Sequence, residues 1–479
     1  MENLILEHRI AQLPLTVALL TYNRAHGFLE EAVNAILNQT FTDFELVILD
    51  NGSTDDTPQV ILAMDDPRIR YVRNPPRSAV EFNYASAYHI ARGKRIIVTH
   101  DDDIMLPHML ETQMRFMDEH PEVILTWTNV STIDQKGNAI SPAMSPRQED
   151  ILFKPGEYIL NFVHERLWPI PSSLMLDRRY NFSPMVRLHY FNSKSVKNNI
   201  RGKNVEGAED VLFPARANVK RSIGFIAEPL LKYRLHPSQG TNGVDLSTPS
   251  IQLYRKLRSF IKRTSIAIDY SMLFDNFIAR YQVQKKITLI SAYPLQLSTK
   301  RYFVNEYQKA SLRAQKNGDA FYSILPLHIL VNVLADSDTP KLDVAAIPAP
   351  KDNQTTAIKC FYQWAERQAE GKTIFHNIKG RVAILGSALV ASLLVLEAKA
   401  AGVEVVCCLE SNIHRQGDML LGVPIVATTW LADNVDLVDT VIFSSEKDQE
   451  NYLSSIIQGI AQNKVTSLSW KAMTSLNGK

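Results

Sequence analysis

The sequence predicts an α/β fold, with a doubly wound, mostly parallel sheet in its first half and a smaller α/β unit at its end. Short apolar runs alternate with stretches that place apolar residues at helical spacing, as in parallel strands joined by helices. Polar clusters directly follow several of these runs, and ligands of such sheets bind at the carboxyl ends of the strands. The same alternation returns after a polar, proline-containing stretch at 336–356.

Composition places the chain among ordinary globular proteins. It has 479 residues, enough for two or three domains, with 45% hydrophobic and 21% charged residues. A formal charge of +2 gives no overall attraction to nucleic acid, so we expect no nucleic-acid partner. The three cysteines fit neither a disulfide framework nor a zinc site. Together with an N-terminus that lacks signal-peptide features and apolar stretches too short to span a bilayer, this predicts a cytoplasmic protein.

Four strands and their helices are expected in the first part of the chain. A glycine at 93 is expected to end the helix before the fourth strand. In order, we expect a strand at 15–22, a helix that places Leu29, Val33, Ile36 and Leu37 on one face, a strand at 45–50, a helix with Pro58 near its start, a strand at 68–72, a helix at 79–91 and a strand at 95–99.

Three polar clusters lie where these strands end. They read TYNR after the first strand, DNGSTDD after the second and HDDD after the fourth. Because the carboxyl ends of parallel strands meet at one edge of the sheet, segments far apart in the chain converge on one crevice. Adjacent carboxylates repel each other, so three aspartates in a row predict a cation or hydrogen-bond donors beside them. The alternative is a solvated acidic turn.

Five segments together resemble the family 2 glycosyltransferases of the GT-A fold. They are LTVALLTYNR, NAILNQTFTDFELVILDNGSTDDT, HDDDIMLP, EDVLFPAR and EPLLKYRLHPSQ, and they cover about residues 13–241 in the order and spacing of the family. Each segment alone is a weak signal, whereas the five together are a strong one. The resemblance implies a GT-A nucleotide-diphospho-sugar transferase fold, a nucleotide-sugar donor and a divalent cation.

The resemblance implies a Mn²⁺ or Mg²⁺ site at the acidic triplet. Carboxylate oxygens are the ligands these cations prefer. The family pattern is Asp, any residue, Asp; alignment on Pro107 puts His100 at its first position and Asp102 at its second. Asp102 is the first choice of ligand, with Asp103 as a further ligand or an orienting group. His236, in YRLHPS, is expected as a third ligand or phosphate contact, with a structural hydrogen bond as the alternative.

The first two clusters are implied to bind the nucleotide. Tyr22 can stack on a base, and Asp50 or Asn51 can accept hydrogen bonds from base or ribose; an amide at Asn51 still accepts from a uracil imide, so UDP is favoured. Asp101 is the expected substitute for the ribose contact where this chain has His100. The implied nucleotide-binding residues are Thr21, Tyr22, Asn23, Arg24, Asp50, Asn51 and Asp101. Arg77 and Asn83, between the third strand and the next helix, are expected to line the same pocket; the alternative is an ordinary loop arginine and a helix-start residue.

By resemblance, Asp210 is the catalytic base and Glu209 orients the base or the acceptor. Direct displacement at the anomeric carbon needs a base on the face opposite the diphosphate, and a carboxylate at a helix start can supply it. The alternative is a carboxylate favoured there by the helix dipole. The segment 178–205 carries seven basic residues and no acidic ones, which suits either a phosphate-bearing acceptor or a solvated loop.

We expect four parts: a GT-A domain at 1–241, a helical segment at 242–336, a linker region at 337–373 and a Rossmann-like α/β domain at 374–479. The sequence LYRKLRSFIKR predicts an amphipathic helix, either packed on a core or lying on an anionic membrane. The last part resembles small Rossmann-like domains of bacterial sugar-modifying proteins. Gly386 is the only glycine in its first turn, so we expect a scaffold or partner-binding role and no dinucleotide.

The predicted function is that of an inverting glycosyltransferase of surface polysaccharide or glycoconjugate synthesis. Its partners would be a nucleotide-sugar donor, a glycan or lipid-linked acceptor and a peripheral membrane contact, with the oligomeric state open. The alternative is a non-catalytic sugar-nucleotide-binding or assembly subunit. It stays open because His100 and Asn51 depart from the commonest residues of the family and because a long second half follows. A nucleotidyltransferase is disfavoured, because TYNR is not a glycine-rich phosphate loop.

Overall fold

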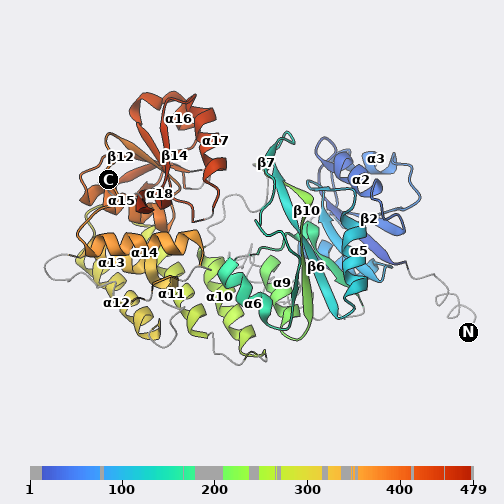
Figure 1. The fold of residues 1–479 in the computed structure, drawn as a ribbon. Helices are drawn as coiled ribbons and strands as arrows, with labels where there is room; N and C mark the ends of the chain where they lie inside the picture. The colour runs from blue at the N-terminus through green and yellow to red at the C-terminus, as the bar shows by residue number, and fades with distance from the viewer. Residues whose placement is uncertain are drawn as a thin grey trace, which may run out of the picture. The chain divides into compact units, whose positions relative to one another are not determined.

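The computed structural model describes residues 13–75, 80–165, 167–178, 209–236, 247–264, 266, 271–314, 322–335, 347, 349–350, 354–410, 415–446 and 448–475 (Figure 1). The chain divides into two compact units. The N-terminal unit comprises Met1–Gly240 and Ser259–Ala267, and the C-terminal unit comprises Thr241–Arg258 and Ile268–Lys479.

The N-terminal unit alternates strands and helices as expected. Its elements are β1 (Leu15–Thr21), α2 (Leu29–Leu37), β2 (Phe44–Asp50), α3 (Thr57–Leu62), β3 (Ile69–Arg73), α4 (Val80–Ile90), β4 (Arg95–His100), β5 (Ile104–Met105), α5 (Met109–Glu119), β6 (Val123–Ile133), β7 (Ala139–Ser141), β8 (Ile151–Phe153), α6 (Glu157–Glu165), the 3₁₀ turn η2 (Pro171–Ser173), β9 (Met175–Asp177), α9 (Glu209–Asn218) and β10 (Ser222–Arg234).

The first four strands form the predicted parallel half of the sheet, in the order β3-β2-β1-β4. Every residue of β1 and β2 is buried, as expected for apolar strands covered on both faces. The core on this sheet includes Leu29, Val33 and Ile36 of α2, so the predicted apolar face of that helix is confirmed.

The second half of the sheet is mixed, whereas the sequence predicted a mostly parallel one. It continues β9-β6-β10-β5, with β9 antiparallel to both β4 and β6, and β5 antiparallel to β10. The short strand β5 pairs Ile104 with Lys232 and Met105 with Leu231. This pairing brings the chain just after the acidic triplet alongside the end of β10, two elements that are more than a hundred residues apart in sequence.

The C-terminal unit contains helices followed by a second sheet. Its elements, with α10 crossing the boundary between the units, are α10 (Ser247–Ile261), α11 (Ser271–Ile287), α12 (Leu297–Ala314), α13 (Leu325–Leu334), α14 (Thr356–Ala369), β11 (Val382–Leu385), α15 (Leu389–Ala400), β12 (Val405–Glu410), β13 (Met419–Leu420), β14 (Val423–Ala427), α16 (Trp430–Asp433), η5 (Val435–Leu437), β15 (Thr440–Phe443), α17 (Glu450–Ala461), β16 (Thr466–Ser469) and α18 (Trp470–Ser475).

The second sheet has the order β13-β14-β12-β11-β15-β16 and is parallel except for β13. Helices α12 to α15 contribute to one hydrophobic core with strands of this sheet. Part of the predicted linker is therefore structured, because α14 buries Ala357, Cys360, Phe361 and Trp364, which recur at helical spacing. The linker was predicted from its polar and proline content. The helical spacing of the apolar residues in α14 is a second pattern in the same region, and it indicates a helix.

The apolar face of the predicted amphipathic helix belongs to the protein core. Leu253, Leu257, Phe260 and Ile261 of α10 are all buried. That face is therefore not available to a membrane, and the core-packing alternative is correct for it. Among the described residues, no helix is long and apolar enough to cross a bilayer.

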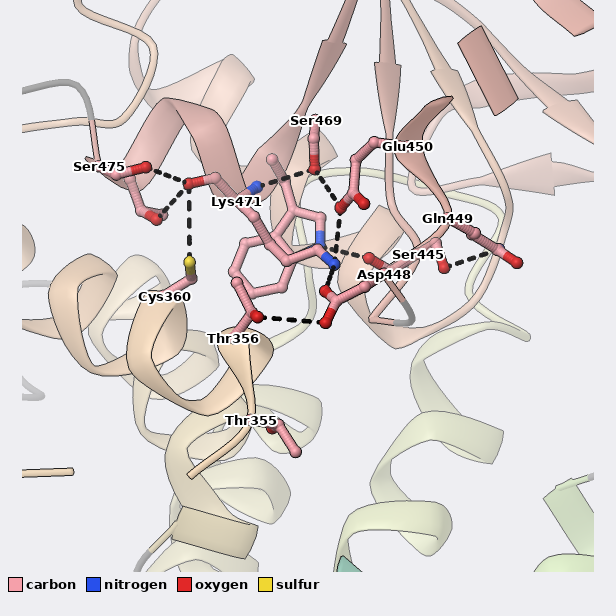
Figure 2. A network of polar contacts seen from close by, with 12 residues as sticks. Thr355, Thr356, Cys360, Ser445, Asp448, Gln449, Glu450, Ser469, Lys471 and Ser475 are labelled. Carbon is pink, nitrogen blue, oxygen red and sulfur yellow. Dashed lines mark hydrogen bonds and ion pairs between the residues drawn. The ribbon is translucent and has the colours of Figure 1, made fainter. Parts of the chain in front are cut away.

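A buried lysine joins several elements at the carboxyl ends of β15 and β16 (Figure 2). The Nζ atom of Lys471 lies 2.6 Å from a carboxylate oxygen of Asp448 and 2.6 Å from one of Glu450, and its side chain is only 5% exposed. The Thr356 hydroxyl of α14 donates to the other Asp448 oxygen at 3.1 Å. These contacts fasten the loop after β15 to α14 and α18, as a buried ammonium requires partners of opposite charge.

Candidate functional site

The parallel register brings the first and second polar clusters to one edge of the sheet. Thr21 at the end of β1 pairs with Asp50 at the end of β2, and Leu20 pairs with His100 at the end of β4. The three predicted clusters therefore follow neighbouring strand ends, where parallel sheets hold their ligands.

Asp50 is fully buried and is held by donors from three directions. One carboxylate oxygen accepts from the Ser53 amide at 2.7 Å and the Ser53 hydroxyl at 2.6 Å, and the other accepts from the Tyr71 hydroxyl at 2.7 Å. Arg73 approaches it at 3.6 Å. Burial, followed by the bond to Asp50, raises the pKa of Tyr71 above its usual range. Asp50 is thus held rigidly at the end of β2.

The TYNR segment forms a tight loop over the second cluster. Asn23 adopts a left-handed backbone conformation with φ of 52°, which asparagine tolerates better than most residues. Its amide donates to the Ser53 hydroxyl at 2.9 Å, and its side-chain oxygen accepts from the Thr54 amide at 2.8 Å. Tyr22 is half exposed, so its ring remains accessible for stacking.

Asp101 connects the first cluster to the third. Its carboxylate lies 3.3 Å from Nε of Arg24, and it is buried. Burial raises the pKa of Asp101, and the hydrogen bond from Thr21 and the charge of Arg24 offset only part of that increase. Asn51 is buried beside this group, and its amide donates to the Thr21 carbonyl at 2.9 Å.

His100, Asp102 and Asp103 form the one group among the described residues that is suited to holding a metal ion. Their ligand atoms all lie within 4.8 Å of one another. Two carboxylates and an imidazole suit a divalent cation such as Mn²⁺, with water or phosphate oxygens at the other positions. Nε2 of the predicted ligand His236 lies 3.0 Å from Oδ2 of Asp102, so His236 contacts this group.

The position of Asp103 is fixed by contacts that hold it inside the protein. Its oxygens accept from the Ser172 hydroxyl at 2.5 Å and from the Arg234 amide at 3.1 Å. Burial, then the neighbouring negative charge of Asp102, raises the pKa of Asp103 well above its ordinary value. A bound cation would remove this penalty, because it stabilises the ionised form of the carboxyl.

Arg234 supports the acidic group from the end of β10. Its Nε donates to the Asp102 carbonyl at 3.0 Å, its guanidinium lies over the Phe28 ring at 4.2 Å, and it pairs with Glu31 at 2.5 Å. The Phe28 ring also contacts His236, at 5.5 Å between centroids. Arg234 and Phe28 therefore fix the geometry of the triplet without supplying a metal ligand.

Asp210 lies at the start of α9, beside a small cavity of about 30 Å³. Tyr84, Tyr88, Pro171 and Phe213 are among the residues that line this cavity with it. Burial raises the pKa of Asp210 to about 6, although the charge of His100 and a hydrogen bond from Trp168 lower it. A carboxylate with a pKa near neutrality is suited to accept a proton.

Tyr84 connects the candidate base to the metal-binding group. Its hydroxyl is hydrogen-bonded to Nε2 of His100, and the two rings meet edge to face. Burial, then the charges of Asp210, Asp103 and Asp102 among others, raises the pKa of Tyr84 well above its ordinary value. Tyr84 thus lies between the two groups, because it lines one cavity with Asp210 and is hydrogen-bonded to His100.

The remaining predicted residues have different outcomes. Asn83 is buried and accepts a hydrogen bond from Asn74, so it helps to hold the chain after β3. Glu209 begins α9, but its side chain lies outside the described part of the structure. Arg77 and residues 179–205 of the basic segment also lie outside the described residues.

Sequence analysis missed Ser172, Tyr84 and Arg234. Ser172 accepts from the amide of His100 at 3.3 Å in addition to bonding Asp103, and it comes from the η2 turn. Neither Ser172 nor Tyr84 has a local signal, because each reaches the site through sheet pairing or helix packing. Arg234 lies in the segment KYRLH, two residues before His236. The sequence therefore indicated this segment as part of the site, but it did not indicate the contacts of Arg234.

The first turn of the second sheet is closed by its own side chains. Gly386 has φ of 113°, and a Cβ atom there would lie 2.4 Å from the Ser444 hydroxyl. Ser387 donates to Glu410 at the end of β12. That the turn cradles no dinucleotide stays a prediction.

Comparison with known proteins gives matches for the first part of the chain. Residues 16–168 match the model of the family described as Glycosyl transferase family 2. An uncharacterized glycosyltransferase of Methanocaldococcus jannaschii is 31% identical over 169 residues, which are 34% of this chain and 55% of that protein. The GalNAc(5)-diNAcBac-PP-undecaprenol beta-1,3-glucosyltransferase of Campylobacter jejuni is 35% identical over 108 residues, 22% of this chain and 35% of that protein.

Among solved structures, the crystal structure of S. aureus TarS 1-349 in complex with UDP is similar to this chain. The match covers 74% of this chain and 88% of the TarS chain, with 15% sequence identity and a TM-score of 0.41. The chain spans between a third and about half of the length of the first curated relatives it matches.

Proposed function

Because the N-terminal unit of this chain is a glycosyltransferase family 2 domain with the predicted GT-A-like α/β fold, we propose that the protein is an inverting, metal-dependent glycosyltransferase. It moves a sugar from a nucleotide-diphosphate sugar to a glycan or lipid-linked acceptor of surface polysaccharide or glycoconjugate synthesis. The observation that carries this proposal is that Tyr84 lines one cavity with Asp210, a carboxyl of raised pKa, and is hydrogen-bonded to His100 of the group formed with Asp102 and Asp103.

Each part of the site has a role in this reaction. Asp102 and Asp103 would hold the cation with His100, and His236 orients Asp102 or adds a ligand. A divalent cation, when bound, neutralises the charge of the diphosphate leaving group. Tyr22 is accessible for stacking on the base, and Asp50 would accept from base or ribose. The buried amide Asn51 is compatible with a uracil imide, so UDP is the favoured nucleotide.

The chemical step requires one proton acceptor. Asp210 takes the proton of the acceptor hydroxyl, and the hydroxyl oxygen forms a bond to the anomeric carbon from the face opposite the diphosphate. The bond between the anomeric carbon and the β-phosphate oxygen breaks, and its electron pair leaves with the nucleoside diphosphate. Attack from the opposite face inverts the anomeric configuration.

Nucleotide binding gives a direct test of the donor site. A ligand that binds only the folded state raises apparent stability by mass action, by about 2.7 kcal/mol at a hundred times its dissociation constant. We expect UDP with Mn²⁺ to raise the thermal unfolding temperature more than UDP alone, or Mn²⁺ alone, at equal concentrations. UMP, which lacks the β-phosphate, is the matched control. Equal shifts with and without Mn²⁺ would contradict the metal-bridged donor site.

The raised pKa of Asp210 predicts a characteristic pH profile. A base must be ionised to accept a proton, and the pKa of Asp210 is about 6. Transfer at saturating donor should therefore rise about tenfold per pH unit below about pH 6 and level off above it. A carboxylate with an ordinary pKa would put this transition near pH 4. The measurement is the transfer rate from pH 4.5 to 8, over which the folded fraction is followed by circular dichroism.

A further inference from the structure

The connection between α11 and α12 in the C-terminal unit exposes several apolar side chains. Leu289 is 75% exposed, Tyr293 46% and Leu297 48%. Of the ten large apolar side chains that are exposed among the described residues, these three fall within nine consecutive positions. Exposed apolar residues that cluster, unlike those scattered singly, indicate an interaction surface.

The backbone of this connection is held in place rather than loose. The amides of Leu421 and Gly422 donate to the carbonyls of Ile290 and Ser291, both at 2.8 Å. Arg415 donates to the carbonyl of Thr288 at 3.0 Å. These hydrogen bonds hold the main chain of the connection against the β13–β14 turn and Arg415. Leu289 is therefore exposed on an ordered segment.

Basic residues surround these apolar side chains. The sequence has no acidic residue between Asp275 and Glu306. Lys285 and Lys286 at the end of α11 are exposed, as is Arg301 near the start of α12, and Lys300 is half-buried. We call the segment 285–301 the α11–α12 hairpin; it carries a formal charge of +4.

The basic side chains and the apolar ones share one surface. A groove of about 430 Å³ is lined by Lys285, Lys286, Leu289 and Tyr302, together with Ile251, Gln282 and one acidic residue, Glu306. The Nζ atom of Lys286 lies over the Tyr302 ring at 3.8 Å. Nζ of Lys399 lies over the Tyr293 ring at 5.0 Å. Cationic groups thus lie beside two of the exposed apolar residues, Leu289 and Tyr293.

We propose that the α11–α12 hairpin is a docking surface for an anionic membrane. Leu289 and Leu297 would enter the boundary between headgroups and acyl chains, with Tyr293 at headgroup level, and the lysines and arginine would contact anionic headgroups. A second copy of this chain is a poor occupant, because two hairpins of charge +4 repel each other. The surface lies outside the donor site, so the proposal does not depend on the proposed function.

This surface differs from the membrane contact that the sequence suggested. That hypothesis placed the bilayer against the apolar face of α10, which is buried. The hairpin lacks an amphipathic helical period; its apolar residues are exposed because a fixed turn presents them. If the acceptor is lipid-linked, docking here would hold the enzyme at the surface where that acceptor resides.

Vesicle co-sedimentation with the full chain tests the proposal. We expect the parent to bind vesicles of equal phosphatidylcholine and phosphatidylglycerol, to bind pure phosphatidylcholine far more weakly, and to lose binding at high salt. Leu289→Ser with Leu297→Ser should reduce the partition coefficient about tenfold or more, since burying a leucine is worth about 1.5–3 kcal/mol. Lys285→Gln with Arg301→Gln should reduce it about thirtyfold, at about 1 kcal/mol for each of the two basic residues.

Two matched controls separate the hairpin from general effects. Leu312→Ser removes a leucine that is 64% exposed on α12 but lies outside the hairpin, and Lys379→Gln with Lys464→Gln removes two exposed charges elsewhere in the same unit. Both controls should bind as the parent does. The exchanged residues are exposed or partly exposed, and unfolding temperatures within error of the parent will show that the variants fold. The proposal is overturned if the parent does not bind anionic vesicles, or if the controls lose as much binding as the hairpin variants.

Discussion

Replacing Asp210 by asparagine is expected to reduce sugar transfer by about 10² to 10⁴, roughly 3 to 5 kcal/mol of barrier, at saturating donor. Asparagine keeps the size of the aspartate and can still accept a hydrogen bond from Trp168, but it cannot take a proton. Donor affinity should change little, because Asp210 lies beside the cavity lined by Tyr84 and Phe213 rather than among the nucleotide-binding loops.

The pH dependence of stability shows whether Asp210→Asn is inactive for a chemical or a structural reason. Burial raises the pKa of Asp210 above its value in the unfolded chain, so the native state binds the proton more strongly. The parent should therefore lose stability as the pH rises from about 4 through about 6, and Asp210→Asn should remove that loss. At pH 8 we expect the variant to be more stable by about 1 to 3 kcal/mol. A variant that is inactive and also less stable at pH 8 would indicate a structural role instead.

Asp50→Asn is the matched variant with the opposite expected profile. Asp50 accepts from Ser53 and Tyr71 at the predicted nucleotide site, and it is not near the proton to be removed. Its substitution should weaken nucleotide binding more than it slows turnover of bound donor. If Asp210→Asn transfers sugar at close to the parental rate, the base lies elsewhere, and Glu209 is the next candidate.

Replacing Asp102 by alanine is expected to abolish the Mn²⁺-dependent part of donor binding and to lower turnover by more than about 10²-fold. Loss of a group that only orients a metal ligand typically costs about ten- to hundredfold. The fold should survive. The side chain of Asp102 contacts His236 at 3.0 Å, and its negative charge is one cause of the raised pKa of Asp103. Removing it therefore relieves repulsion in the metal-free protein.

Binding of Mn²⁺ by isothermal titration calorimetry, in the presence of UDP, measures this effect. Asp118→Ala is a suitable control, because Asp118 is an exposed carboxylate of the same unit that pairs with Arg95 outside the site. It should leave the Mn²⁺ affinity unchanged. Parental affinity in Asp102→Ala would exclude Asp102 as a principal ligand and would leave His100 and Asp103 to be tested in its place.

The sequence predicted the parts of the site that depend on strand order. Apolar runs mark β1, β2 and β4, and polar residues directly after them necessarily meet where parallel strands end. Thr21, Asp50 and Asp101 could be placed in this way, because each position follows from its own strand. The acidic triplet at the end of β4 was identifiable for the same reason.

The contacts that position the site could not be predicted in this way. Ser172 reaches Asp103 from the η2 turn, 69 residues away, and Arg234 reaches it through the pairing of β10 with β5. Antiparallel pairing of short strands such as β5 and β9 leaves little periodic signal, so the sequence did not predict the mixed half of the sheet. The α10 pattern predicted an apolar face correctly, but sequence alone did not decide whether protein or membrane covers it.

Turnover of the donor tests the central claim most directly. Purified full-length protein is incubated with UDP-sugars, with Mn²⁺ or with EDTA, and release of UDP is measured alongside Asp210→Asn and Asp102→Ala. We predict Mn²⁺-dependent release of UDP from at least one donor, by hydrolysis or by transfer to an added acceptor, which EDTA abolishes and both variants lose. Binding of UDP and Mn²⁺ without release from any nucleotide-diphosphate sugar, in the presence of lipid-linked and glycan acceptors, would contradict the claim and favour a non-catalytic sugar-nucleotide-binding subunit.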